Sequence, residues 1–415
     1  MKMLRVVLSA IAGNALEIYD MVVYGLFASV IAQHFFPSEE QLTGLTNIFA
    51  LFFIGYLARP LGAIVFGRIG DRYGRKPALL MSIWLMALST CGIGLIPDYD
   101  TIGGPILLLL NLRILQGFSC GGELIGSIIF LVEHAPRERR GFYGSLGGAG
   151  YSLGLLMASL LMWLINTSFD QVEMMRWAWR LPFLLAALGG IVGWLARRAV
   201  PETDLFLETY KLPQSYFTTR RDIAKQLRPT IMIVGIQLFA AVLGYLIYVF
   251  MVIYMSNILH YTIRQALGIH FVSVILLVLL KPCMGMLSDR IGRRPLMFFA
   301  LIGTMLWAWP YFWLLQQHSL ALALLAQLVM TLFAAAYIAI DIVTMVEMVP
   351  LQWRFTVVSI AYALAVSLFG GITPFMATLL IKAMNSYYSL ALYLVVAALI
   401  SLFAVYKIRE TKPTK

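Results

Sequence analysis

The protein has 415 residues, of which 61% are hydrophobic and only 12% are charged. This charged fraction is about half of the ~25% typical of soluble domains, so the composition excludes a soluble globular protein. A membrane-spanning helix needs ~20 mostly apolar residues, which leaves room for about twelve spans. Transmembrane barrels alternate apolar and polar residues, whereas runs such as 106–110 and 275–280 are apolar throughout. A barrel is therefore excluded as well.

Apolar runs between charged or Pro/Gly-marked breaks predict the spans in chain order. They are expected at 6–33, 42–66, 78–97, 105–132, 142–165, 179–197, 229–256, 266–287, 296–315, 320–346, 356–381 and 387–406. The first run contains Asn14, Glu17 and Asp20 and is too long for a cleavable signal peptide, so we expect it to stay in the membrane. The sequence thus predicts an all-α polytopic membrane protein with an N-terminal six-helix half (1–197), a central cytoplasmic linker (198–228), a C-terminal six-helix half (229–406) and a short tail (407–415).

The net charge of +11 would suggest a nucleic-acid partner in a soluble chain, but here the basic residues follow the predicted loops. Most Lys and Arg residues fall in loops on one side, and the opposite loops hold only Arg176, Arg264 and Lys382. By the positive-inside rule, both termini are expected to be cytoplasmic. The basic residues therefore indicate topology, and we expect no nucleic-acid partner.

Neither cysteine nor histidine spacing indicates a metal site. Cys91, Cys120 and Cys283 lie in apolar surroundings without paired spacing, and the five histidines are scattered along the chain. The pattern predicts neither a disulfide framework nor a metal centre.

Two loop segments occur twice in the chain at matching positions. GRIGDRYGRKP (67–77) after span 2 returns as GMLSDRIGRRP (285–295) after span 8, and EHAPRERR (133–140) after span 4 returns as EMVPLQWR (347–354) after span 10. Such a repeat indicates duplicated halves of matching topology. The alternative is that the charged residues of these loops act only as stop-transfer signals. We expect a conformational latch formed by Gly67, Asp71, Arg72, Gly74, Arg75, Asp289, Arg290, Arg293, Glu133, Arg140, Glu347 and Arg354.

With these motifs the chain resembles the major facilitator superfamily, and more narrowly its metabolite:proton symporter family. Further matching segments are GNALEIYD (13–20), RPLG (59–62), RILQGFSCGGE (113–123), WRLPF (179–183) and Tyr362 with GGITPF (370–375). The resemblance implies the fold of that superfamily, proton-coupled uptake of a small organic acid, amino acid or betaine, and a substrate-binding role for Tyr362. Ile18 departs from the family, whose members usually have an aromatic residue there.

The first span carries one polar face. At 100° per residue, Asn14, Glu17, Asp20 and Tyr24 fall within an arc of about 120°. Charges inside a bilayer cost at least ~2.5–3.5 kcal/mol each, so they normally face a partner or a wet cavity. Two desolvated carboxylates cannot readily ionise together, so Glu17 and Asp20 are expected to carry the coupling proton. Asn14 and Tyr24 are expected to bind substrate, although Asn14 and Glu17 could instead only bond neighbouring helices.

The fourth span places Arg113, Gln116 and Glu123 on one stripe. A guanidinium fork suits a substrate carboxylate or a protonatable acid, so Arg113 and Gln116 are expected to bind substrate and Glu123 to be a further proton-coupling candidate. The alternative for Arg113 is an interfacial position reached by snorkelling.

In the second half, Lys281 and Asp341 lie at matching depths on spans 8 and 10. One expectation is that they form an ion pair in only one conformation, which makes Asp341 a proton-coupling candidate. The other is that Lys281 binds a substrate carboxylate. A permanent structural bridge is the alternative. Arg59 is expected to support the loop motif.

No nucleotide-binding motif or catalytic triad is present, so we expect a transporter driven by an ion gradient and not an enzyme. The expected mechanism is alternating access by rocking of the two halves. We expect no cofactor beyond the proton as coupling ion, a small-molecule substrate, the lipid bilayer as surroundings, a functional monomer, and a location in the bacterial cytoplasmic membrane. A proton-coupled exporter of the same fold, a transport-inactive sensor and a membrane-bound transferase are the alternatives.

Overall fold

The structure, a computed structural model, describes residues 2–36, 40–73, 75–97, 105–121, 123–198 and 220–411. The N-terminal helices are α1 (Lys2–Leu26), α2 (Ala28–Phe35), α3 (Gln41–Leu57), α4 (Arg59–Tyr73), α5 (Arg75–Gly94), α7 (Ile106–Ser119), α8 (Glu123–His134), the 3₁₀ turn η1 (Arg137–Arg139), α9 (Arg140–Ser168), α10 (Gln171–Arg176), the 3₁₀ turn η2 (Ala178–Arg180) and α11 (Leu181–Arg198).

The C-terminal helices follow from residue 220. They are α13 (Arg220–Tyr245), the π-helical turn η3 (Leu246–Phe250), α14 (Met251–Ile253), the π-helical turn η4 (Tyr254–Ile258), α15 (Ile263–Ile291), α16 (Arg293–Leu315), α17 (Leu320–Ile338), α18 (Asp341–Met348), α19 (Leu351–Ala365), the π-helical turn η5 (Val366–Gly370), α20 (Thr373–Met384) and α21 (Ser389–Lys407). Helix α13 thus begins inside the segment that the sequence predicts as linker.

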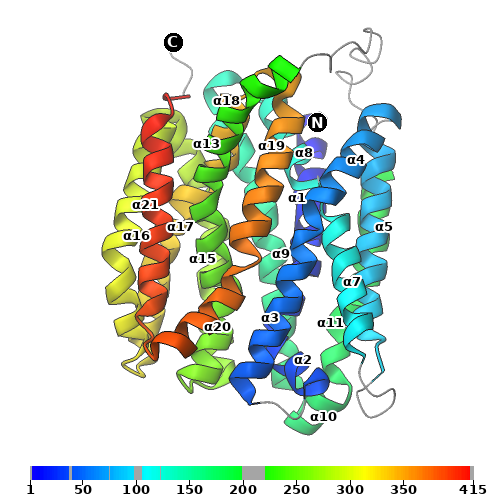
Figure 1. Ribbon diagram of the computed structural model, residues 1–415, viewed down its shortest axis with the longest axis vertical. Helices are drawn as coiled ribbons and strands as arrows, with labels where there is room; N and C mark the ends of the chain where they lie inside the picture. The colour runs from blue at the N-terminus through cyan, green and yellow to red at the C-terminus, as the bar shows by residue number, and fades with distance from the viewer. Residues whose placement is uncertain are drawn as a thin grey trace.

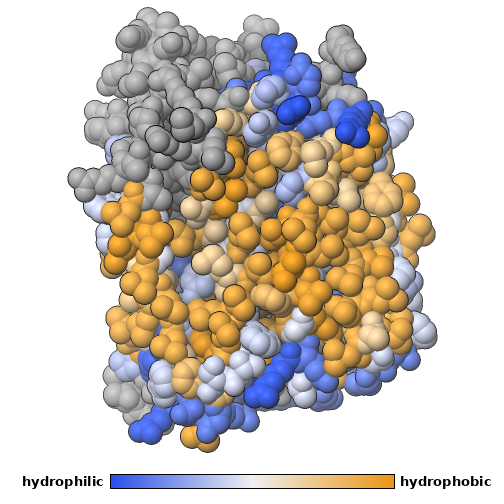
Figure 2. Space-filling model, turned by 180° about the vertical axis from the view of Figure 1, so that it is seen from behind, coloured by the Kyte–Doolittle hydropathy of each residue, from blue (hydrophilic) through white to orange (hydrophobic). Residues whose placement is uncertain are grey.

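Helix length and composition agree with the predicted spans. Within the described part of the chain, ten helical segments are long and apolar enough to cross a membrane. Helices α1 and α2 are together long and apolar enough for one more span, with a bend of 56° between them, and Leu80–Gly94 within α5 is a shorter apolar helix. These segments account for the twelve predicted spans, so the prediction of an all-helical polytopic membrane protein is confirmed. On the face shown in Figure 2, hydrophobic side chains cover the middle of the molecule and hydrophilic ones gather at its two ends.

The two sets of helices lie side by side, and both termini lie at the same end of the bundle (Figure 1). We call this end the terminal face and the opposite end the far face. The sets meet where α9 packs against α15. A Cβ at Gly141 or Gly285 would lie 2.6 Å from the carbonyl oxygen of the other glycine, so small residues allow this close crossing.

Several spans are broken near the middle of the bundle. Between α3 and α4, Pro60 has no N–H to give to the carbonyl of Tyr56. That carbonyl instead accepts a hydrogen bond from the Ser367 hydroxyl of η5, at 2.6 Å. Irregular backbone at membrane depth is tolerated only where protein or a cavity satisfies it, and transporters place their sites at such breaks.

Candidate functional site

A close approach of α3 and α7 places Arg113 in the middle of the bundle. A Cβ at Gly117 would overlap the carbonyl oxygen of Gly55, and a Cβ at Gly55 would lie 2.8 Å from the carbonyl oxygen of Arg113. Adding volume to such a contact forces backbone shifts that typically cost ~1–3 kcal/mol. The two glycines therefore let α7 lie against α3 and direct Arg113 between the N-terminal helices.

Arg113 is 0% exposed and sits over two aromatic faces. Its guanidinium carbon lies 4.2 Å from the ring centroid of Tyr24 and 4.9 Å from that of Phe52. Its Nη1 donates to Oε1 of Gln116. Its Nε and Nη2 have no hydrogen-bond acceptor among the residues that the structure describes.

The contacts of the Arg113 guanidinium are too weak to compensate for the burial of its charge. A cation–π contact contributes ~0.5–2 kcal/mol, whereas a buried charge without its partner costs ~3–5 kcal/mol. Two aromatic faces and one amide oxygen thus hold the Arg113 guanidinium in place but do not neutralise it. An anion with two acceptor oxygens would satisfy the remaining donors.

Gln116 connects Arg113 to the first helix. Its amide nitrogen donates to the main-chain carbonyl of Asp20 and to the hydroxyl of Thr90, both at 2.7 Å. Because its amide oxygen accepts from Arg113, Gln116 is fully used as a positioning group. The structure therefore brings the predicted residues Arg113, Gln116, Asp20 and Tyr24 together.

The two carboxylates of α1 have different surroundings. Oε1 of Glu17 forms an ion pair with Nη2 of Arg59 at 2.6 Å, and its Oε2 accepts the main-chain N–H of Leu124, at the start of α8, at 3.1 Å. Asp20 is 5% exposed, and its carboxylate makes no hydrogen bond or ion pair with the described residues. Glu17 is thus held by two other helices, whereas Asp20 is the carboxylate left unpaired on the polar face.

Arg59 is the site residue that sequence reasoning missed. It is 4% exposed, and its guanidinium carbon lies 5.6 Å from the ring centroid of Tyr362 on α19. The expectation that it supports the loop motif is wrong, because its side chain points to Glu17 in the centre. The signal that could have found it is the pairing rule for charges at membrane depth. By that rule, Glu17 needs a basic partner, and this partner has to lie on another span.

Asn14 is occupied by neighbouring helices. Its amide nitrogen donates to the carbonyl of Gly147 on α9 at 3.0 Å, and its amide oxygen accepts from the hydroxyl of Ser127 on α8 at 2.8 Å. The structure thus gives Asn14 the helix-bonding environment that was the alternative to substrate contact. The side chain of Glu123 lies outside the described residues.

Lys281 and Asp341 do not form the expected ion pair in this conformation. Nζ of Lys281 donates to the carbonyl of Gly148 on α9 at 2.8 Å and lies 5.6 Å from the ring centroid of Tyr151. Asp341 is 2% exposed, and its Oδ1 accepts the main-chain N–H of Ile342 at 2.7 Å. The structure therefore does not contain a permanent salt bridge between Lys281 and Asp341. Lys281 instead links the C-terminal helices to α9.

Those predicted latch residues whose side chains the structure describes lie near the terminal face. The carboxylate of Asp289, at the end of α15, accepts the main-chain N–H groups of Gly141 and Phe142, at the start of α9, at 2.8 and 2.9 Å. Nη1 of Arg293 binds the same carboxylate at 2.8 Å. These contacts join the two sets of helices because a carboxylate is stabilised at a helix N-terminus.

A second pair of contacts involves the repeated Glu and Arg positions. Glu133 of α8 and Arg354 of α19 form an ion pair at 3.2 Å between the two sets, and Glu347 binds Arg293 at 3.2 Å within the C-terminal set. Arg290 is exposed at the end of α15, and Nε of Arg140 is buried without an acceptor among the described residues. Gly74 and the side-chain surroundings of Gly67, Asp71, Arg72 and Arg75 lie outside the described residues.

We expect Asp289→Asn to favour opening at the terminal face. The amide keeps the size of the carboxylate but loses its negative charge, which the N–H groups of Gly141 and Phe142 and the guanidinium of Arg293 contact. Hydrogen bonds to charged groups contribute ~1.5–3 kcal/mol each, so the closed state should lose on the order of 10- to 100-fold in relative population. Labelling rates of single cysteines introduced between α9 and α15 measure the change.

Asp170→Asn is the matched control for this substitution. Its carboxylate also caps a helix, since it accepts the N–H of Glu173 at the start of α10 at 2.7 Å, but it joins no second set of helices. Equal labelling of wild type and Asp289→Asn would show that the contact does not set the conformation.

With this geometry established, comparison with known proteins identifies the family. The sequence matches the family model described as Major Facilitator Superfamily over residues 10–374, with a second match over 233–415. The chain belongs to the major facilitator superfamily. It is a multi-pass membrane transporter and not an enzyme.

Related proteins of known activity cover almost the whole chain. The glycine betaine/proline/ectoine/pipecolic acid transporter OusA of Dickeya dadantii is 34% identical over 425 residues, covering 99% of this chain and 84% of OusA. A citrate-proton symporter of Salmonella typhi is 33% identical over 405 residues, covering 96% of this chain and 92% of the symporter. The shikimate transporter of Escherichia coli is 32% identical over 423 residues, covering 98% and 95%.

Solved structures share the fold at lower identity. The proton:xylose symporter XylE bound to 6-bromo-6-deoxy-D-glucose has a TM-score of 0.80 at 16% identity, covering 99% of this chain and 96% of that one. A partially occluded inward-open XylE of E. coli has a TM-score of 0.78 at 19% identity, covering 100% and 99%. These similarities confirm the predicted superfamily fold.

Proposed function

We propose that this transporter takes up a small solute that carries a carboxylate, together with a proton, and that Arg113 binds the carboxylate. The observation that carries the proposal is the buried Arg113 guanidinium with Nε and Nη2 unpaired among the described residues. The names of the relatives agree with it, because betaine, proline, citrate and shikimate all carry carboxylates. Tyr24 and Gln116 hold the guanidinium, and Tyr362 lies beside Arg59 near the same centre.

Asp20 is the residue that we propose for proton transfer. An unpaired carboxylate in a mostly apolar setting is costly when ionised, which favours proton uptake before the site changes its exposure. Gln116 connects it to the solute site, since this amide binds both the Asp20 main chain and the Arg113 guanidinium. Glu17, Glu123 and Asp341 remain the other proton-coupling candidates.

Alternating access is the proposed mechanism, with residues 1–197 and 229–406 as the two rocking halves. The contacts of Asp289 with α9 and of Glu133 with Arg354 keep the terminal face closed in this conformation. Lys281 and Asp341 are free to pair in another conformation, since neither is held by an ion pair among the described residues in this one. The proposal also includes the proton as coupling ion, with no further cofactor.

The proposed topology places the terminal face in the cytoplasm of a bacterium and the far face outside. The support is the loop charge, because Lys and Arg residues concentrate in loops near the termini and only Arg176, Arg264 and Lys382 lie in the opposite loops. We propose that the transporter works in the lipid bilayer as a monomer. Export of lipophilic cations would favour a cavity without bases, whereas the centre contains Arg113 and Lys281.

We expect the purified transporter to be stabilised by carboxylate solutes and not by their neutral or cationic counterparts. The test compares thermal unfolding with proline and prolinamide, glycine betaine and choline, and shikimate and its methyl ester. A ligand at 100 times its Kd stabilises the folded protein by about 2.7 kcal/mol. Equal stabilisation by both members of each pair would contradict carboxylate recognition.

A further inference from the structure

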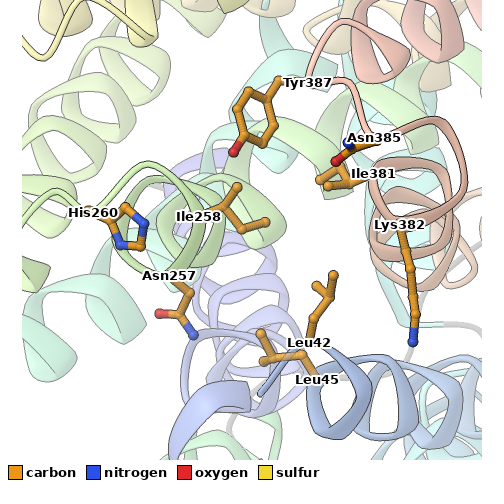
Figure 3. Close-up of a pocket in the computed structure, with 9 residues that line it drawn as sticks. All are labelled: Leu42, Leu45, Asn257, Ile258, His260, Ile381, Lys382, Asn385 and Tyr387. Carbon is orange, nitrogen blue, oxygen red and sulfur yellow. The ribbon is translucent and has the colours of Figure 1, made fainter. Parts of the chain in front are cut away.

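A cavity of about 380 Å³ opens between the two sets of helices at the far face. Figure 3 shows Lys382 on one side of the opening and Asn257 and His260 on the other. The N-terminal set contributes Leu42 and Leu45 of α3 to its wall. The volume is within the ~300–1,000 Å³ of small-molecule pockets, so a small solute fits.

The polar lining of this cavity favours an anion. Of the nine described residues that line it, Lys382 is the one with a permanent positive charge, and none of the nine is acidic. The Lys382 ammonium donates to the neutral hydroxyl of Thr43 at 3.2 Å. The Asn257 amide oxygen accepts from Ser256 at 2.9 Å, while its amide nitrogen is buried without an acceptor among the described residues. The Lys382 ammonium thus has unused donor capacity at this cavity, and the Asn257 side chain lines the same cavity.

One face of α3 connects the cavity to the buried centre. Leu42, Leu45, Phe49, Phe52 and Tyr56 follow one another at intervals of three and four residues and therefore lie on one side of the helix. At 1.5 Å per residue, Leu45 lies about 10 Å along the helix axis from Phe52, which contacts Arg113.

Between these levels the two sets of helices are in contact. The rings of Phe49 on α3 and Phe250 on η3 have centroids 5.8 Å apart. Deeper in the bundle, the hydroxyl of Tyr245 donates to that of Tyr56 at 2.6 Å. The cavity is therefore separated from the Arg113 centre by aromatic contacts that must part before a solute can pass.

We infer that this cavity is a loading site, where Lys382 binds the carboxylate of the incoming solute, with Asn257 in the wall beside it, before the solute reaches Arg113. The inference rests on the proposed function, since it concerns the same carboxylate solute. The site is partly open to solvent, so its binding is weaker than that of the buried centre. Its role is to raise the rate of capture.

The test measures initial uptake of a carboxylate solute into proteoliposomes by wild type, Lys382→Gln and Lys382→Arg. We expect Lys382→Gln to lower kcat/KM on the order of 3- to 10-fold through KM, with kcat unchanged, and Lys382→Arg to retain capture. Added salt should reduce kcat/KM of the wild type but have less effect on Lys382→Gln, because screening acts on the charge that was removed.

Two controls separate capture from structure. Thr43→Val removes the hydroxyl contact of Lys382 but keeps the ammonium, so it should leave kcat/KM near the wild-type value. Lys407→Gln removes an exposed charge at the opposite end of the bundle and should have no effect. A kcat/KM unchanged in Lys382→Gln, a loss confined to kcat, or an equal loss in Thr43→Val would overturn the loading site alone. Absence of wild-type uptake for every carboxylate tested would overturn the proposed function and the loading site together.

Discussion

Replacing Arg113 by lysine is expected to weaken binding of the carboxylate solute by about 10- to 100-fold. Lysine keeps the positive charge and can still lie against Tyr24 and Phe52, but it has no rigid fork of donors. The substitution therefore removes one or more charge-assisted hydrogen bonds from the Nε and Nη2 donors, each contributing ~1.5–3 kcal/mol. Direct binding to the purified protein by calorimetry measures the loss without the proton gradient.

Arg180→Lys is the matched control for this measurement. Arg180 is another arginine of the N-terminal set and is half-buried, but its Nη1 donates to the carbonyls of Gly94 and Ile96 at 3.0 and 2.5 Å. Its replacement should lower stability and leave affinity unchanged. If Arg113→Lys bound the solute as tightly as the wild type, Arg113 would not be the carboxylate site.

The spans could be predicted because each depends on a local property of the chain. A run of ~20 apolar residues has few alternatives to a membrane helix, whatever it packs against. The latch contact of Asp289 also follows a local rule, since an aspartate at the end of one helix suits the N-terminus of another. The helix that supplies this N-terminus is determined by tertiary packing. The sequence does not state that Gly141 and Phe142 are the partners.

The polar centre could be predicted as a set of residues but not as a set of pairs. The helical projection correctly placed Asn14, Glu17 and Asp20 on one face of α1, yet it could not assign their neighbours. In the structure the side chains of Asn14 and Glu17 are bonded to other helices, whereas the Asp20 carboxylate has no partner among the described residues. The partner of Glu17 is Arg59, on another span, and such pairings depend on helix packing that periodicity does not encode.

Asp20→Asn is expected to abolish accumulation driven by a pH gradient while leaving solute exchange intact. The amide resembles the permanently protonated carboxylate, so the transporter can bind solute and change its exposure but cannot release a proton inside. For one proton per solute, each pH unit, acidic outside, supports about tenfold accumulation, because one unit corresponds to 1.36 kcal/mol. The mutant should show no accumulation above the outside concentration. Counterflow at equal pH should proceed at a rate similar to that of the wild type.

Glu17→Gln is the comparison that distinguishes proton transfer from disturbance of the site. It leaves Arg59 buried without its 2.6 Å partner, and such a broken ion pair costs ~3–5 kcal/mol. Stability and solute binding should therefore fall, and exchange should fall together with accumulation. Both variants are measured in proteoliposomes with an imposed pH gradient and, separately, by counterflow. If Asp20→Asn still accumulates solute when the gradient is imposed, the proton is carried by another carboxylate. Glu17, Glu123 and Asp341 are then tested in the same way. For Asp341, pairing with Lys281 would release the contact of Lys281 with Gly148 on α9 and so couple proton release to the contact between the two halves.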